Sequence, residues 1–122
     1  MGKYGEVAVK ATCRLVSAKI TDLREAWNSA ERTIFTYSKH CPRSAYVGLC
    51  EERMVKGVQG GRWLTSDVNK SYAVRAVEAL RDDPTWLDRK TDLWRFVSRS
   101  PNKVPNGQLD VVFGLWRKGL IT

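Results

Sequence analysis

Apolar side chains recur at helical spacing along almost the entire chain, with polar side chains between them. Near the start, Val7, Ala11 and Leu15 follow one another at intervals of four residues. Such spacing places side chains on one face of an α-helix, whereas a half-buried strand would show strict alternation. Similar stripes recur further along, as Leu23, Trp27, Ala30 and Ile34; Ala73, Ala76, Val77 and Leu80; Leu93, Phe96 and Val97; and Leu109, Val112, Phe113 and Trp116. The pattern therefore predicts an all-α fold in which these residues, Phe96 included, point inward.

Capping and turn residues divide this pattern into five or six helices. Pro42 suits the first turn of a helix, where a missing N–H loses no partner, and Cys41 is the expected cap residue. Gly119 follows the last stripe, where a helix end favours a left-handed residue. The expected helices are residues 4–16, one beginning at Thr21 or Asp22, one from Pro42 to about Met54, one from about Ser66 to Asp82, one or two short ones between Thr85 and Pro101, and a last one over residues 109–116. Because 122 residues match one ordinary domain, residues 1–122 are expected to form a single compact helical domain.

Two glycines lie in the middle of predicted helices. Gly48 and Gly114 each precede a leucine in an otherwise apolar stretch. Glycine inside a helix costs about 1 kcal/mol relative to alanine, so a compensating contact is expected. A close helix crossing supplies one, because the absence of a side chain lets a neighbouring helix approach. The sequence predicts tight crossings at both glycines, and one arrangement packs these two helices against each other.

The chain is strongly basic. It has 21 Lys and Arg against 13 Asp and Glu, a formal net charge of +8. Such an excess is typical of proteins that bind nucleic acid or acidic partners, although solubility alone can also account for it. Both halves of the chain carry the same net charge and no basic tail is present, so an electrostatic site must be a folded surface. The densest excess comprises Arg53, Lys56, Arg62, Lys70 and Arg75, with Asp67 counted as the only opposing charge.

The segment of residues 56–65 is the clearest loop, since it contains three glycines. It lacks the Gly-Lys-Ser/Thr ending of a phosphate-binding loop, and no predicted strand precedes it. Trp63 lies beside Arg62 and away from every apolar stripe. Two interpretations of Trp63 remain open: an exposed ring that stacks on bases or anchors a protein, or a lid folded over the core.

Little in the sequence points to catalysis. Three cysteines without a secretory signal predict free thiols in a reducing compartment. Cys13 and Cys50 are expected to pack in the core, and Cys41, beside His40 near a helix start, is the one candidate nucleophile. Because the chain has one histidine and no paired carboxylates, the sequence assigns no catalytic residue, metal or cofactor. No apolar run is long enough to span a membrane, so a cytoplasmic location is expected.

Four segments carry a resemblance to a known family. They read MGKYGEVAVKA at the start, CPRSAYVGLCEERMVKGV in the centre, NKSYAVRAVEAL after it, and NGQLDVVFGLWRKGLI at the end. Together they extend over nearly the whole chain, which resembles a small bacterial domain family of unknown function. The resemblance implies a stand-alone cytosolic domain from a bacterium or a phage, and it implies no activity, cofactor or catalytic residue.

The sequence favours a non-enzymatic binding module that engages nucleic acid or another anionic partner. The expected binding residues are Arg53, Lys56, Arg62, Trp63 and Lys70. The alternative is a protein–protein interaction domain, such as a regulator or a mobile-element inhibitor of a host complex, in which aromatic residues anchor the partner. A third hypothesis, an enzyme that depends on Cys41, rests only on the charges around that thiol.

Overall fold

The computed structural model describes residues 2–63 and 67–122, and it confirms the all-α fold. In chain order the elements are α1 (Lys3–Val16), α2 (Leu23–Arg32), α3 (His40–Glu51), α4 (Val68–Asp82), the 3-10 helix η1 (Pro84–Asp88), α5 (Lys90–Ser98) and α6 (Gln108–Arg117). Within these described residues no strand is present, and an isolated antiparallel bridge joins Val55 to Ile121. Between Thr85 and Pro101, where one or two short helices were expected, the structure has two, η1 and α5.

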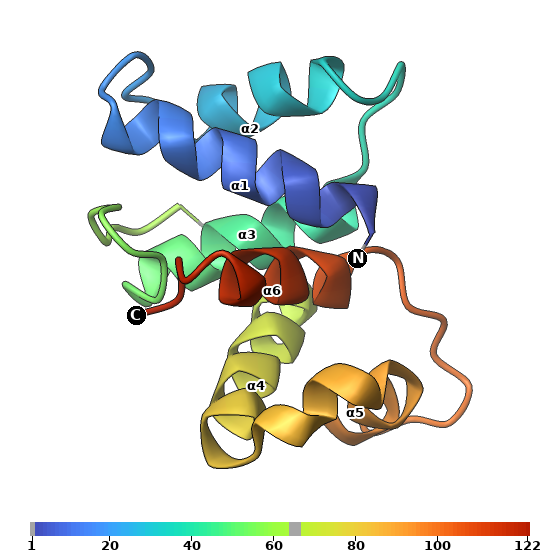
Figure 1. Cartoon of the computed structure of the whole chain (residues 1–122). Helices are drawn as coiled ribbons and strands as arrows, with labels where there is room; N and C mark the ends of the chain where they lie inside the picture. The colour runs from blue at the N-terminus through green and yellow to red at the C-terminus, as the bar shows by residue number, and fades with distance from the viewer. Residues whose placement is uncertain (1, 64–66) are drawn as a thin grey trace.

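The helices lie in three tiers. As Figure 1 shows, α1 and α2 form an antiparallel pair above α3 and α6, and α4 with α5 lies below them. The most extensive contacts join α3 to α4, α1 to α6 and α1 to α2. Trp27 of α2 and Tyr46 of α3 are fully buried, with ring centroids 5.3 Å apart. This aromatic contact fills the core between the upper pair and α3.

Local chemistry explains most helix boundaries. Of the two predicted cap residues, Thr21 and Asp22, it is Asp22 that caps α2, by accepting the N–H groups of Arg24 (2.9 Å) and Glu25 (3.1 Å). The prediction that Cys41 caps α3 is wrong, because the helix already includes His40 and its cap is Lys39. Pro42 still lies in the first turn, where its missing N–H is tolerated.

Two further boundaries differ from the sequence prediction. Helix α3 ends at Glu51 and not at Met54, because the chain reverses through Arg53 in a left-handed conformation, φ +58°. The predicted start of the next helix near Ser66 lies outside the described residues. In the described part, α4 runs from Val68, with Asp67 as its cap accepting the N–H of Asn69 (2.7 Å).

Both mid-helix glycines lie at tight helix crossings, as predicted. The two glycine-containing helices do not cross each other at these points, however, because each glycine faces a different helix. A Cβ on Gly114 would lie 2.4 Å from the Cα of Gly5 in α1. A Cβ on Gly48 would lie 2.5 Å from both Cβ and Cγ of Lys70 in α4. The crossing at Gly114 therefore joins α6 to α1, and the crossing at Gly48 joins α3 to α4.

Two side chains expected in the core are exposed. Phe96 is 59% exposed, because the buried face of α5 turns toward Trp94, whose indole N–H donates to the carbonyl of Lys103 (2.6 Å). Cys13 is exposed because it lies on the face of α1 opposite the buried Val7 and neighbouring residues. Cys50 is buried, as predicted.

Candidate binding surface

Four of the five predicted binding residues lie in the segment after α3, and Lys70 lies in the first turn of α4. The start of this segment is fixed against the C-terminal residues. The N–H of Lys56 donates to the carbonyl of Leu120 (2.7 Å), and the N–H of Thr122 donates to the carbonyl of Met54 (2.9 Å). These backbone bonds give the loop a defined shape, and Gly57, at φ +80°, makes the turn that follows.

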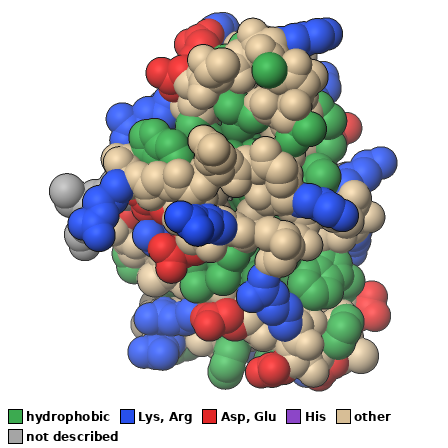
Figure 2. Space-filling model, turned by 90° about the vertical axis from the view of Figure 1, so that its left-hand side faces the viewer, with side chains coloured by type: hydrophobic (Ala, Val, Ile, Leu, Met, Phe, Trp, Pro, Cys, Tyr) green, Lys and Arg blue, Asp and Glu red, His purple; other side chains and the backbone are tan. Residues whose placement is uncertain are grey.

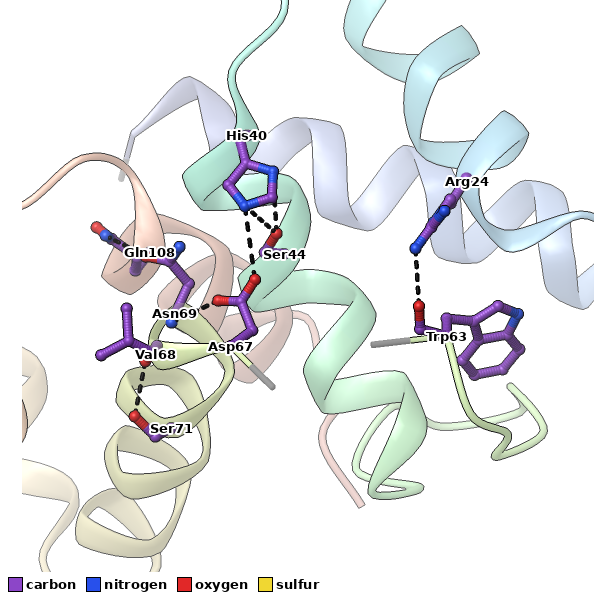
Figure 3. A network of polar contacts seen from close by, with 9 residues as sticks. All are labelled: Arg24, His40, Ser44, Trp63, Asp67, Val68, Asn69, Ser71 and Gln108. Atoms are coloured by element: carbon purple, nitrogen blue, oxygen red, sulfur yellow. Dashed lines mark hydrogen bonds and ion pairs between the residues drawn. The ribbon is translucent and has the colours of Figure 1, made fainter. Parts of the chain in front are cut away.

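Trp63 is held through its backbone from two sides, and Figure 3 shows one of them, the hydrogen bond from Arg24. Its N–H donates to a carboxylate oxygen of Glu51, and its carbonyl accepts a hydrogen bond of 2.8 Å from Nη2 of Arg24. The indole ring lies on Gly61, where a Cβ would be 2.6 Å from a ring carbon. The side chain remains 37% exposed. Trp63 therefore rests on its own loop with part of its ring available to a ligand.

A groove of about 340 Å³ separates this loop from the connection between α1 and α2. We call it the loop groove, and its lining residues are Leu15, Ala18, Thr21, Leu23, Gly57, Val58, Gln59, Gly60 and Trp63. Its side chains are mostly apolar, and the indole of Trp63 contributes to its wall. The groove is a candidate site for a flat apolar group such as a base or an aromatic side chain.

The expectation that only Asp67 opposes the basic cluster is wrong. Nζ of Lys70 lies 3.0 Å from a carboxylate oxygen of Glu51 and 3.3 Å from one of Glu52. The hydrogen bond to Glu51 is the main cause that raises the pKa of Lys70. The two acidic residues precede Arg53 directly in the sequence, and the crossing of α3 with α4 at Gly48 brings them against Lys70. Lys70 is thus part of an ion-pair network and not a free cation.

The other predicted cations remain available. Arg53, Lys56 and Arg62 are exposed, and none forms an ion pair within residues 2–63 and 67–122. The side chain of Arg53 lies along Gly60, where a Cβ would be 2.6 Å from its Cγ. Figure 2, which views the loop side of the molecule, shows Lys and Arg side chains dispersed among hydrophobic and acidic ones. On this face the described residues therefore form a mixed surface, without one continuous basic patch.

A second polar network, which the sequence analysis did not identify, joins α3 to the start of α4 (Figure 3). Nε2 of His40 lies 3.0 Å from Oγ of Ser44 and 3.5 Å from Oδ2 of Asp67. The spacing of His40 and Ser44 by four residues was visible in the sequence, but the approach of Asp67 depends on the tertiary fold. In a nucleophilic triad the serine and the carboxylate contact different nitrogens of the histidine ring. Here Ser44 and Asp67 both lie closest to Nε2 of His40, and Ser44 is only 2% exposed, so the arrangement does not match a triad.

The part of the chain that the structure describes was searched for metal sites, disulfides and membrane-spanning helices. In residues 2–63 and 67–122, no group of three or more His, Cys, Asp or Glu side chains is placed to hold a metal ion. Cys13, Cys41 and Cys50 are all free thiols. Over the same residues, no helix combines the length and apolar character needed to cross a bilayer.

Comparison with known proteins identifies a family for this chain. Residues 1–122 match the model of a family described as "Family of unknown function (DUF6979)". The chain belongs to this family. The match extends over all 122 residues of this DUF6979 chain and confirms the resemblance to a family of unknown function. No curated protein matches the chain, and no solved structure matches it. The functional argument for this DUF6979 domain therefore rests on its own residues.

Proposed function

We propose that this protein is a non-enzymatic binding module whose loop groove engages single-stranded nucleic acid. The observation that supports the proposal is the position of Trp63. Its backbone is held by Glu51 and Arg24, and its ring lies partly exposed at a mostly apolar groove. A ring held in this way can stack on an unpaired base without a large loss of side-chain entropy.

The cations near the groove complete the binding site. Arg53, Lys56 and Arg62 lie in the same loop as Trp63 and have no competing ion pair in the described residues. They are the expected contacts for the phosphates that flank a stacked base. Lys70 is excluded from this set because Glu51 and Glu52 already neutralise it.

The mixed surface favours a single strand over a duplex. A duplex presents phosphates and stacked base edges, so its affinity depends on an extended basic surface. Here acidic and apolar side chains interrupt the cations (Figure 2). An unpaired base, by contrast, exposes the flat face that Trp63 and the groove can accept.

Fluorescence anisotropy with a labelled single-stranded oligonucleotide tests the proposal. Trp63→Ala and Arg62→Ala are expected to weaken binding while the melting temperature changes little. For Arg62→Ala, the slope of log affinity against log salt should fall by about 0.7, the value for one phosphate contact on a single strand. Lys103→Ala is the matched control, because Lys103 is an exposed cation in the distant connection before α6. An unmodified protein that does not bind the oligonucleotide at low salt would contradict the proposal.

A protein partner at the same groove is the second candidate function. The apolar side chains of Leu15, Leu23 and Val58 favour it, because such a lining can receive an anchoring side chain from an acidic partner. Affinity capture from host lysate, with and without nuclease, separates the two candidates. A protein that survives nuclease treatment and is lost with Val58→Asp would favour the protein partner; loss of every partner on nuclease treatment would favour nucleic acid.

As part of the same proposal, we place the protein in the cytoplasm of a bacterium or of a phage-infected cell. The three free thiols support this, since such thiols are typical of reducing compartments. Protein isolated from its source with two protons missing from its non-reduced mass would contradict this placement.

A further inference from the structure

A second groove lies at the opposite end of α4 from Lys70, where α4, η1 and α5 meet. It measures about 280 Å³, and we call it the aromatic groove. Its lining residues are Arg75, Glu78, Ala79, Asp82, Trp86, Phe96 and Arg99. None of them belongs to the loop groove, so the inference drawn from them does not rest on the proposed function.

Two stacked aromatic rings form the apolar part of this groove. Trp86 and Phe96 lie with ring centroids 5.5 Å apart and an interplanar angle of 21°. The guanidinium of Arg89 lies 4.1 Å from the centroid of Trp86. Phe96 nevertheless remains 59% exposed. An exposed aromatic ring beside arginine is the composition that distinguishes the centre of a protein interface from ordinary surface.

Charges of both signs surround the rings. Glu78 and Asp82 are one turn apart on the same face of α4, and Arg99 ends α5 in a left-handed conformation, φ +57°. Throughout the described residues, none of these three forms an ion pair. Arg75 differs, because its Nη1 donates to the carbonyl of Val97 (2.8 Å). The groove thus offers two carboxylates and one guanidinium to an external partner.

We propose that the aromatic groove is the contact surface between two copies of this chain in a two-fold symmetric dimer. A two-fold interface places one surface against itself, so it must be self-complementary. The aromatic groove meets this requirement, because Glu78 and Asp82 of one copy can pair with Arg99 of the other. Phe96 of each copy then fills the groove of its neighbour. Nucleic acid fits this groove poorly, since Glu78 and Asp82 offset Arg75 and Arg99 and leave the lining without the excess of positive charge that phosphates favour.

Sedimentation equilibrium of the full chain tests the dimer. The unmodified protein is expected to self-associate with a dissociation constant below about 1 mM, so that dimers form at protein concentrations up to that value. Phe96→Ser should raise the dissociation constant by about thirtyfold, as expected for a central aromatic side chain. Its far-UV circular dichroism should match that of the parent, because Phe96 is largely exposed. A protein that remains monomeric throughout this range overturns the proposal.

A charge-reversal experiment tests which residues meet. Glu78→Arg with Asp82→Arg, the acid reversal, places only positive charges in the groove and should abolish self-association. Arg99→Glu, the arginine reversal, should abolish it too. An equimolar mixture of the two variants should form a heterodimer, because each reversed charge then meets its opposite. Arg95→Glu is the matched control on α5, since Arg95 lies outside the groove near Asp92. Reversal variants that still self-associate, or a mixture that stays monomeric, would overturn the proposed pairing.

Discussion

Gly114→Ala is expected to destabilise the protein, although alanine is the better helix former. The α carbon of Gly114 lies so close to α1 that an added Cβ would be 2.4 Å from Cα of Gly5 and 2.8 Å from its carbonyl carbon and oxygen. All three of these atoms belong to the backbone. No rotamer change can move them away, so the two helices must separate.

The size of the effect follows from two opposing contributions. Carbon atoms in contact are about 3.5 Å apart, so α6 must shift from α1 by about 1 Å. A gap of that size forfeits a quarter to a half of the dispersion energy of the neighbouring contacts, and overpacking of this kind costs about 3 kcal/mol at its upper range. Alanine returns about 1 kcal/mol through helix propensity. The net loss is about 2 kcal/mol, which lowers the melting temperature by roughly 6–12 °C in a domain of this size.

Thermal and urea unfolding followed by circular dichroism at one fixed protein concentration measure this loss. Gly48→Ala is the comparison variant, because its Cβ would lie 2.5 Å from Cβ and Cγ of Lys70 and 2.9 Å from its Cα. Of these atoms Cγ can move by a change of rotamer, whereas all three contacts of Gly114 are with backbone atoms. Gly48→Ala is therefore expected to lose less stability than Gly114→Ala. The reasoning is refuted if Gly114→Ala melts at or above the parent temperature, or if Gly48→Ala proves the more damaging of the two.

Three other predictions concern the thiols, the pH dependence and a helix cap. Brief alkylation followed by peptide mass mapping should modify exposed Cys13 and leave buried Cys50 intact until the protein unfolds; equal labelling would contradict the assigned burial. Burial raises the pKa of Cys50 to about 12 and that of Tyr46 well above its ordinary value. Both groups stay neutral in the folded state where the unfolded chain ionises, so the free energy of unfolding should fall as the pH rises from about 9 toward 12. Urea titrations at about pH 8 and pH 10.5 should show a smaller fall for Cys50→Ala, and an unchanged fall would exclude that thiol as a cause. Asp22→Ala should cost about 1 kcal/mol by removing the cap of α2, whereas Asp22→Asn should cost little; equal losses would point away from capping.

The helices could be predicted from the sequence because their signals are local. The stripe that includes Leu109 and Phe113 lies within a few turns, and the cap at Asp22 acts on the next three residues. Periodicity identifies which residues share a face, but it does not identify the element that covers that face. For this reason Gly48 and Gly114 could be recognised as crossing points while their partners, Lys70 and Gly5, could not.

The direction of a narrow helix face was the least predictable feature. Leu93 and Val97 of α5 are buried as expected, but the third buried residue of this helix is Trp94 and not Phe96. Trp94 follows Leu93 and Phe96 precedes Val97, so either aromatic residue could widen the apolar stripe of α5 by one position. The choice depends on the connection after α5, which supplies the carbonyl of Lys103 to the indole of Trp94.

The binding loop could be located from its glycines, but its interactions could not be predicted. Trp63 is fixed by Arg24, which is 39 residues away in the sequence, and by Glu51. Asp67 approaches His40 from a different helix. These contacts form only when α2, α3 and α4 have packed, so the local sequence around each residue does not predict them. Glu51 and Glu52 were visible beside Arg53, and a charge count that included them would have indicated a less basic site.

Lys70 distinguishes a structural cation from a binding one. Its partner Glu51 has a side chain that is only 2% exposed, while the side chain of Lys70 is 29% exposed. Removing one partner of a buried pair costs about 3–5 kcal/mol, and solvent at Lys70 reduces this, so Lys70→Ala should cost about 1–3 kcal/mol. Arg62→Ala, by contrast, removes an exposed cation that forms no ion pair with any described residue, and it should cost almost no stability.

The two variants should therefore separate in two measurements. Lys70→Ala should lower the melting temperature and leave the salt slope of oligonucleotide binding unchanged, whereas Arg62→Ala should do the reverse. Adding Glu51→Gln to Lys70→Ala should restore part of the stability, because a neutral amide is less costly to bury than a carboxylate that has lost its ion pair with Lys70. If Lys70→Ala instead melts with the parent and lowers the salt slope by about 0.7, Lys70 contacts phosphate directly and its pairing with Glu51 contributes little to the fold.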